Sequence, residues 1–283
     1  MKIIDTHTHF YDPFRPQGVP WPGTEDSLIY RTVLPEHHRE VAAPTGVVGT
    51  VVSAASVWPD DNQWVLDLVT PEDPWIVGVV GYIGSDDDFS ANVDRLAANP
   101  FYRGIRAGAD FVDDTDGHAL ERVESMAEHD LMVDICGTVN RAHDICSLAD
   151  RVPQLRWVLN HCGEPSIDGK APDPSWVDYI QAVSQFPQIF CKVSGLVEYS
   201  QIKPAPSELD YYLPVLEVLW DAFGEDHLIY SSNWPVCDVD SDHDTVQAIV
   251  RSFFEPKGEV AQEKYWWKNA KAAYKYVSHC HGT

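Results

Sequence analysis

The chain has 283 residues, of which 44% are hydrophobic and 23% are charged, so it is long enough to bury a large core. Its formal net charge of −24 argues against nucleic acid or an anionic membrane surface as partner, because the field of the whole molecule would repel both. No apolar run approaches the roughly 20 residues of a membrane span, and the N-terminus lacks the layout of a signal peptide. The six cysteines form no CxxC pair. We therefore expect a reduced, cytoplasmic protein, compatible with a homo-oligomer, whose partner is a small-molecule substrate.

The first segment, residues 2–6, predicts a buried β-strand that ends in the pair His7 and His9. Side chains on a strand alternate between two faces, so Asp5, His7 and His9 are expected to project to one side. The rise per residue places the two histidine Cα atoms roughly 6.6 Å apart, which lets both imidazoles reach one metal ion. Two inert, hydrogen-bonded histidines at a strand end are the alternative interpretation.

After this strand, residues 11–30 form a long loop punctuated by prolines, and its aromatic residues indicate a packed cover over the strand end. Beyond the loop, apolar strand-like segments alternate with amphipathic helix-like segments. The eight predicted strands are residues 2–6, 46–53, 75–83, 102–106, 131–136, 156–161, 189–194 and 227–232. The predicted helices are residues 34–43, 60–69, 85–99, 116–129, 140–150, 175–185, 208–223, 244–254 and 260–276.

Eight strands that alternate with helices predict parallel pairing, because parallel strands need crossover helices. The number of units and the length of the chain predict an α/β fold, a (β/α)8 TIM barrel, with residues 1–283 as a single domain. A doubly wound sheet would normally carry a glycine-rich phosphate turn after its first strand, where this chain has histidines and aromatic residues.

In such a barrel the active site lies at the C-terminal ends of the strands. Polar groups on apolar strands cost free energy unless they have partners, so several at one rim indicate a site. Three of these residues also have a purely structural interpretation. Arg106 could pair with Asp134 or Asp110, Lys192 could pair with Asp5, and His161 could be a hydrogen-bonded core histidine. The rim residues are His7, His9, Arg106, Asn160, His161, Lys192, Ser194, Ser231, Ser232, Asn233 and Trp234.

Four segments in order resemble the amidohydrolase superfamily, in its amidohydrolase 2, lactonase-type branch: DTHTH (residues 5–9), VLNHCG (158–163), CKVSGL (191–196) and YSSNWPV (230–236). Residues 61–67 and 103–106 fit the same pattern, so the resemblance covers nearly the whole chain.

The resemblance implies a barrel hydrolase that opens a cyclic ester, either a sugar lactone or a carboxylated lactone. By the same resemblance, His7 and His9 are metal ligands or groups that polarise a carbonyl, and His161 is a third ligand or a proton relay. His161, Asn233 and Lys192 are the catalytic candidates. Arg106, Arg103 and Trp234 are the candidates for binding substrate.

The chain departs from the family pattern in two places. Many relatives have an aspartate that activates water where this chain has Asn233, and an amide cannot accept that proton. The base is then His161, Glu164 or Asp238, or a metal-bound hydroxide. Residues 131–136 contain no histidine or lysine that could bridge two ions, so we expect one divalent ion, zinc or manganese, or none.

Two other classes of function stay open. A metal-dependent, non-oxidative decarboxylase of the same superfamily would release carbon dioxide. A relative that has lost catalysis would bind a lactone without turning it over.

Overall fold

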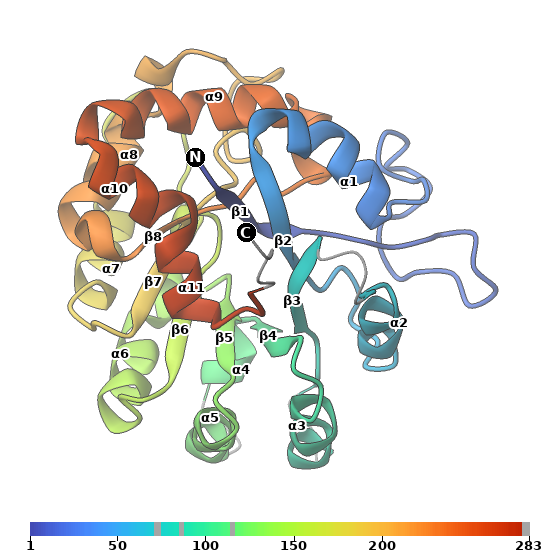
Figure 1. Ribbon diagram of the computed structural model, residues 1–283. Coiled ribbons are helices and arrows are strands. Elements are labelled where there is room, and N and C mark those ends of the chain that lie inside the picture. Colours follow the sequence, from blue (N-terminus) through green and yellow to red (C-terminus); the bar gives the residue numbers. More distant parts are fainter. Residues whose placement is uncertain (71–74, 85–87, 114–116, 279–283) are drawn as a thin grey trace.

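The structure is a computed structural model that describes residues 1–70, 75–84, 88–113 and 117–278. Eight parallel strands form one sheet in sequential order (Figure 1). A parallel bridge between Thr8 and Trp234 brings the two edges of the sheet together. The sheet is therefore a nearly closed barrel, and the predicted fold is confirmed. The strands are β1 (Ile3–Thr8), β2 (Val47–Ser53), β3 (Ile76–Gly81), β4 (Tyr102–Ala107), β5 (Met132–Ile135), β6 (Arg156–Leu159), β7 (Ile189–Val193) and β8 (Leu228–Tyr230).

Helices surround this sheet at close to the predicted positions (Figure 1). The short α4 was not predicted, because four residues are too few to display a helical period. The predicted helix over residues 260–276 is interrupted by a π-helical turn, Lys264–Lys268. Parts of two predicted helices, residues 85–87 and 116, lie outside the described residues. The helices are α1 (Pro35–Ala42), α2 (Asp61–Asp67), α3 (Phe89–Ala97), α4 (Ala109–Val112), α5 (Ala119–Glu128), α6 (Ala142–Arg151), α7 (Pro174–Val183), α8 (Leu209–Phe223), α9 (His243–Phe254), α10 (Glu259–Glu263) and α11 (Asn269–Tyr274).

The apolar side chains form two clusters, one between the sheet and the helices and one inside the barrel. Inside the barrel, residues from the strands pack against α11, and Tyr274 is fully buried there. Arg103 near the start of β4 and Arg156 at the start of β6 donate hydrogen bonds to the carbonyls of Tyr274 and Ala273, at 2.9 and 2.7 Å. Helix α11 therefore closes the N-terminal end of the barrel and leaves the C-terminal end as the place for a site.

The prediction that Asp5, His7 and His9 share one face is wrong for Asp5. Its carboxylate accepts a hydrogen bond from His38 of α1, outside the barrel, at 3.2 Å. His7 instead contacts Lys192 in the barrel interior. The pairing of β1 with β2 shifts register between Asp5 and Thr8, and such an irregularity breaks the simple alternation of faces.

Within the described ranges, no helix combines the length and the apolar character needed to cross a membrane. The five cysteines of that part of the chain are free thiols.

Candidate active site

Three histidines converge at the C-terminal end of the barrel. The Nε2 atoms of His7 and His9 lie 3.2 Å apart. The ring of His161, which follows β6, has its centroid 4.5 Å from that of His7. Two nitrogen ligands of one tetrahedral zinc ion would be roughly 3.3 Å apart, given Zn–N distances of about 2.05 Å. The two imidazoles thus lie close enough to share one ion, and the ring of His161 lies beside them.

The outer nitrogen of each ring is held by a neighbour. His9 Nδ1 lies 2.9 Å from the carbonyl of Ser53, which can only accept, so this nitrogen carries the proton. His9 Nε2 is therefore a bare acceptor. His161 Nδ1 lies 3.0 Å from the hydroxyl of Ser194. Such contacts fix the orientation of each ring, which is what both metal binding and proton relay require.

His7 can adopt either tautomer, and the two have different consequences. Its Nδ1 lies 3.1 Å from Asn160 Oδ1 and 3.0 Å from Lys192 Nζ. If Nδ1 donates to Asn160, both Nε2 atoms are free to ligate a metal. If Nδ1 accepts from Lys192, the His7 Nε2–H donates to His9, and the same rings form a metal-free relay.

A column of buried polar groups supports the histidines from below. Lys192 of β7 forms an ion pair with Asp134 of β5, and both side chains are fully buried. Tyr274 of α11 donates to Asp134 at 2.9 Å, and Lys192 donates to Asn160 at 3.0 Å. Burial lowers the pKa of Lys192, although Asp134 acts in the opposite direction. The partner of Lys192 is thus Asp134 and not Asp5, and its amino group lies beneath His7.

Above the histidines lies an open cleft of about 370 Å³, within the range of small-molecule sites. Trp21, from the long loop 11–30, packs edge-on to His9 with ring centroids 5.6 Å apart, so the loop does cover the strand end as predicted. Arg106 of β4 is anchored by a hydrogen bond from Nη1 to the carbonyl of Ala54 at 3.0 Å. The cleft is lined by His9, Trp21, Ala55, Arg106, His161, Glu164, Glu198, Tyr199, Asn233 and Val236.

Left-handed backbone delivers the side chains to this cleft. The four residues from His161 to Glu164 all have positive φ, and Asn233 has φ of 61°. For residues with a Cβ this conformation costs roughly 1–2 kcal/mol each, and such strain gathers at functional sites. Trp157 and Leu159 belong to the outer cluster, so simple alternation along the strand would turn His161 outward as well. Strand β6 ends at Leu159, and the turn redirects His161 into the cleft.

The electrostatics keep the imidazoles neutral. Burial, followed by Arg106, lowers the pKa of His9 to about 3, against smaller upward effects of Ser53 and Asn233. Burial also lowers the pKa values of His7 and His161 well below the usual value of a histidine. The nearby positive charge of Lys192 adds to this effect for His7, and that of Arg106 adds to it for His161. Neutral imidazoles can ligate metal or accept a proton. In contrast, burial raises the pKa of Glu198 to about 7.

A second group of potential ligands, Asp5, His38 and His243, lies outside the barrel with its ligand atoms within 4.8 Å of one another. Trp75 Nε1 donates to His38 Nδ1 at 3.1 Å, so the proton of His38 sits on Nε2, where it donates to Asp5. Neither nitrogen of His38 is then free for a metal. The group instead fixes Asp5, which accepts from the backbone N–H and the hydroxyl of Ser232 at 2.9 and 2.6 Å and so holds the chain just before Asn233.

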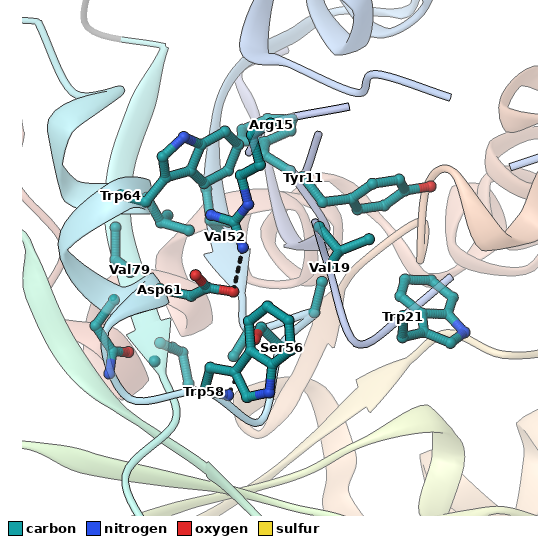
Figure 2. A pocket seen from close by; sticks show the side chains of 17 residues that line it. Tyr11, Arg15, Val19, Trp21, Val52, Ser56, Trp58, Asp61, Trp64 and Val79 are labelled. Atoms are coloured by element: carbon teal, nitrogen blue, oxygen red, sulfur yellow. Dashed lines mark hydrogen bonds and ion pairs between the residues drawn. The ribbon is translucent and has the colours of Figure 1, made fainter. Parts of the chain in front are cut away.

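A narrower cavity beside the cleft is lined mainly by apolar and aromatic side chains (Figure 2). Its volume of about 20 Å³ is room for about one water molecule. Arg15 Nη2 forms an ion pair there with Asp61 Oδ2 at 2.6 Å, and Trp58 and Trp64 line the cavity. Trp21 and Ala55 separate it from the larger cleft. The ionisable groups gather in the larger cleft, which is the better candidate site.

The structure brings together His7, His9, His161, Arg106 and Asn233, places Lys192 in contact with His7 beneath the cleft, and places two other candidates elsewhere. Lys192 and Trp234 are buried and do not line the cleft. Trp234 packs against His38, with ring centroids 5.3 Å apart. Arg103 contacts α11 at the opposite end of the barrel. Glu198, which lies five residues beyond the end of β7, was not predicted from the sequence. The only available signal was a glutamate in a loop on the catalytic side of a barrel.

A barrel with neutral imidazoles, an arginine and two carboxylates at the C-terminal ends of its strands has the layout of a barrel enzyme. The sequence model of the family described as Amidohydrolase matches residues 4–276, and the chain belongs to this family.

Among its relatives is the L-fucono-1,5-lactonase of Burkholderia ambifaria, which is 31% identical over 241 residues, covering 82% of this chain and 80% of the relative. Crystal structures of an amidohydrolase from Burkholderia multivorans, one with bound HEPES and one with bound zinc, superpose with TM-scores of 0.85 and 0.84. They share 24% and 23% sequence identity over 98% of this chain and 100% of theirs. A 2,6-dihydroxybenzoate decarboxylase has a TM-score of 0.69 at 13% identity, covering 97% of this chain and 99% of its own. These structural likenesses show the fold.

Proposed function

We propose that the protein is a lactonase that hydrolyses the ring ester of an uncharged sugar 1,5-lactone. The observation that carries this proposal is the 31% identity to an L-fucono-1,5-lactonase over most of both chains. The cleft supports it, because it offers donors and acceptors for sugar hydroxyls beside a group of neutral imidazoles. Trp21 and Tyr199 add aromatic faces against which a sugar ring can pack.

The charges of the cleft favour a neutral substrate over a carboxylated one. Arg106 is the one cationic side chain among the described residues that line the cleft, whereas Glu164 and Glu198 bring two carboxyl groups. Arg141, which would have suited a carboxylated ring, pairs instead with Asp113 and Asp144. A dicarboxylate would meet two acidic groups and only one arginine.

Hydrolysis of a lactone needs an oxyanion stabiliser and proton transfer. Arg106 supplies a fixed positive charge at the cleft wall and suits the oxygen on which negative charge develops. His9 and His161 are neutral at pH 7, so they can hydrogen-bond water or a substrate hydroxyl without electrostatic repulsion from Arg106.

The donor set also fits one divalent ion. His7, His9 and His161 would hold it, since their rings converge, are neutral and are fixed at their outer nitrogens. A bound zinc or manganese ion would polarise the ester carbonyl as a Lewis acid. The zinc-bound relative supports zinc as the first ion to test.

The test is a pH-indicator assay of the purified protein on L-fucono-1,5-lactone, with a five-membered sugar lactone and a carboxylated pyrone for comparison. The turnover rate is compared between three preparations: protein as purified, protein stripped with chelator, and stripped protein reloaded with zinc or manganese. We expect fastest turnover of the uncharged 1,5-lactone. The control variant His161→Asn, chosen because asparagine tolerates left-handed backbone, should be at least about 100-fold slower. If no lactone is opened in any metal state, the proposal is wrong, and carbon dioxide release from a hydroxybenzoate would point to a decarboxylase.

A further inference from the structure

Glu198 is a carboxylate in the cleft with a specific attachment. It lies in the segment between β7 and α8 and lines the cleft together with His9, His161 and Asn233. Asn233 Nδ2 donates a hydrogen bond to Glu198 Oε1 at 2.7 Å. Among the described residues nothing donates to the other oxygen, Oε2, which is buried. A buried carboxylate oxygen without a donor is costly, so this atom is prepared for a proton or for a donor brought by the substrate.

The attachment gives a physical reason for an amide at position 233. A carboxylate can only accept hydrogen bonds, so the amide nitrogen of Asn233 must face Glu198. An aspartate at position 233 would place its carboxylate oxygen about as far from Glu198 as the amide nitrogen of Asn233 is now. Two carboxylates at that distance could not both stay ionised. The Asp5–Ser232 contacts and the left-handed backbone of Asn233 hold the amide in place. The pair Glu198 and Asn233 is thus chemically complementary, whereas Glu198 with an aspartate would not be.

We infer that Glu198 is the general base of this enzyme and that Asn233 is the residue that positions it. This inference rests on the proposed lactonase function. Glu198 takes a proton from water while the water oxygen forms a bond to the ester carbonyl carbon. When the tetrahedral intermediate collapses, the bond from that carbon to the ring oxygen breaks, and the proton passes from Glu198 to the ring oxygen. The product is the open hydroxy acid, and Glu198 is again ionised.

The charged surroundings of Glu198 are consistent with this role. Lys203 donates to the backbone carbonyl of Glu198 at 2.9 Å and pairs with Asp240 at 2.5 Å, so its charge is partly engaged. Burial raises the pKa of Glu198 to about 7, which is near the optimum for a base that must both take and return a proton at neutral pH. Glu164, the other carboxylate of the cleft, already accepts from the Gly137 N–H at 3.0 Å.

The test compares Glu198→Gln with the matched variant Glu164→Gln in metal-loaded protein. Glutamine keeps the shape and can still accept from Asn233, so we expect an unchanged thermal midpoint and KM within about threefold, with kcat lower by about 10²–10⁴-fold. Glu164→Gln should lose less than about tenfold. In wild type the kcat profile should rise through a pKa near 7, and Glu198→Gln should lack this limb. Formate or azide should partly restore Glu198→Ala, which a purely structural role would not explain.

The outcomes separate the inference from the function on which it rests. If wild type opens lactones and Glu198→Gln keeps more than about a tenth of kcat with the pH limb intact, Glu198 is not the base. If Glu164→Gln is the inactive variant, the base is Glu164. If wild type opens no lactone at all, the proposed function fails, and the role of Glu198 fails with it.

Discussion

At the scale of single residues, the site is defined by how each polar atom is used. His9 is fixed as an acceptor toward the cleft because its other nitrogen must donate to the Ser53 carbonyl. Asn233 is fixed as a donor because Glu198 can only accept. His7 has two consistent tautomers, and the choice between Asn160 and Lys192 as its partner separates metal binding from a metal-free relay. The chemistry therefore depends on a few hydrogen positions that geometry largely determines.

Asn233→Asp tests the relation between the two residues directly. The variant places a second carboxyl group against Glu198, and two such groups share one proton, so the pair ionises fully only at higher pH. Since the pKa of Glu198 is already raised to about 7 by burial, we expect the rising limb of the kcat profile to move up by about one unit or more. Activity at pH 7 should fall by about tenfold and recover near pH 9, after correction for spontaneous lactone opening.

The control is Asn233→Ala, which removes the hydrogen bond without adding charge. It should lower kcat by up to about 10²-fold, as expected for a lost orienting contact, without shifting the limb upward. An Asn233→Asp variant that is as active as wild type at pH 7 would contradict the proposed contact with Glu198.

At the scale of elements, two strands and helix α11 build one support. The interior-facing residues of β5, β7 and α11 provide Asp134, Lys192 and Tyr274, which are linked by an ion pair and a hydrogen bond. Helix α11 therefore does more than close the barrel, because it completes the buried polar column on which His7 rests. A buried ion pair of this kind is weak evidence for stability, but loss of one partner is strongly destabilising.

We expect Lys192→Met to lower the free energy of unfolding by about 3–5 kcal/mol, because it leaves Asp134 buried without its cation. The double variant Lys192→Met/Asp134→Asn should recover most of this loss, since the amide can still accept from Tyr274 and carries no charge. Urea denaturation followed by circular dichroism measures both. Lys170→Met, which breaks an ion pair with Asp168 on the surface, is the control and should leave the midpoint unchanged. Equal stability of Lys192→Met and wild type would show that the pair does not anchor the column.

The elements also indicate where prediction from the sequence succeeds. The eight strands and most helices follow from apolar runs and periodicity, and the rule that barrel sites lie at C-terminal strand ends brought His7, His9, His161, Arg106 and Asn233 to one place. The rule could not tell the two ends of a strand apart for Arg103, which lies near the start of β4. The expected alternation of side chains between the two faces of a strand also fails at the register shift after Asp5 and at the left-handed turn at His161. Glu198 was missed because the position of a loop side chain depends on tertiary contacts that no local pattern encodes.

At the scale of the whole molecule, the charge and the titration of the site act together. The net charge of −24 does not repel an uncharged lactone, but it does repel the carboxylate that hydrolysis forms, so it favours release of product. The same reaction acidifies its surroundings, and the folded protein carries histidines that resist protonation. Stability as a function of pH is therefore informative about the site.

We expect the chelator-stripped protein to lose stability as pH falls from 7 to 5. The pKa values of His7, His9 and His161 are lowered in the folded state, chiefly by burial, so below the ordinary value of 6.5 the unfolded chain binds protons that the folded one does not. The loss continues toward the folded pKa, about 3 for His9. Glu198 opposes this, because its raised pKa, about 7, makes the folded state bind a proton that the unfolded one releases above its ordinary value of 4.5.

The three histidines, joined by His243, whose pKa is also lowered by burial, outweigh the one glutamate, so the free energy of unfolding falls as pH falls near pH 5.5. A group that is protonated in the unfolded chain and neutral in the folded one contributes at most about 1.4 kcal/mol per pH unit. Urea titrations at half-unit steps of pH measure this slope. His161→Asn should reduce the slope by roughly one histidine's share, whereas His143→Gln, at an exposed position, serves as the surface control. Added zinc should steepen the slope, because a metal binds only the neutral imidazoles of the folded protein. A stability that is flat or rises as pH falls through 6 would mean that the three rings are not held neutral, and the site would then not be prepared for either a metal or a proton relay.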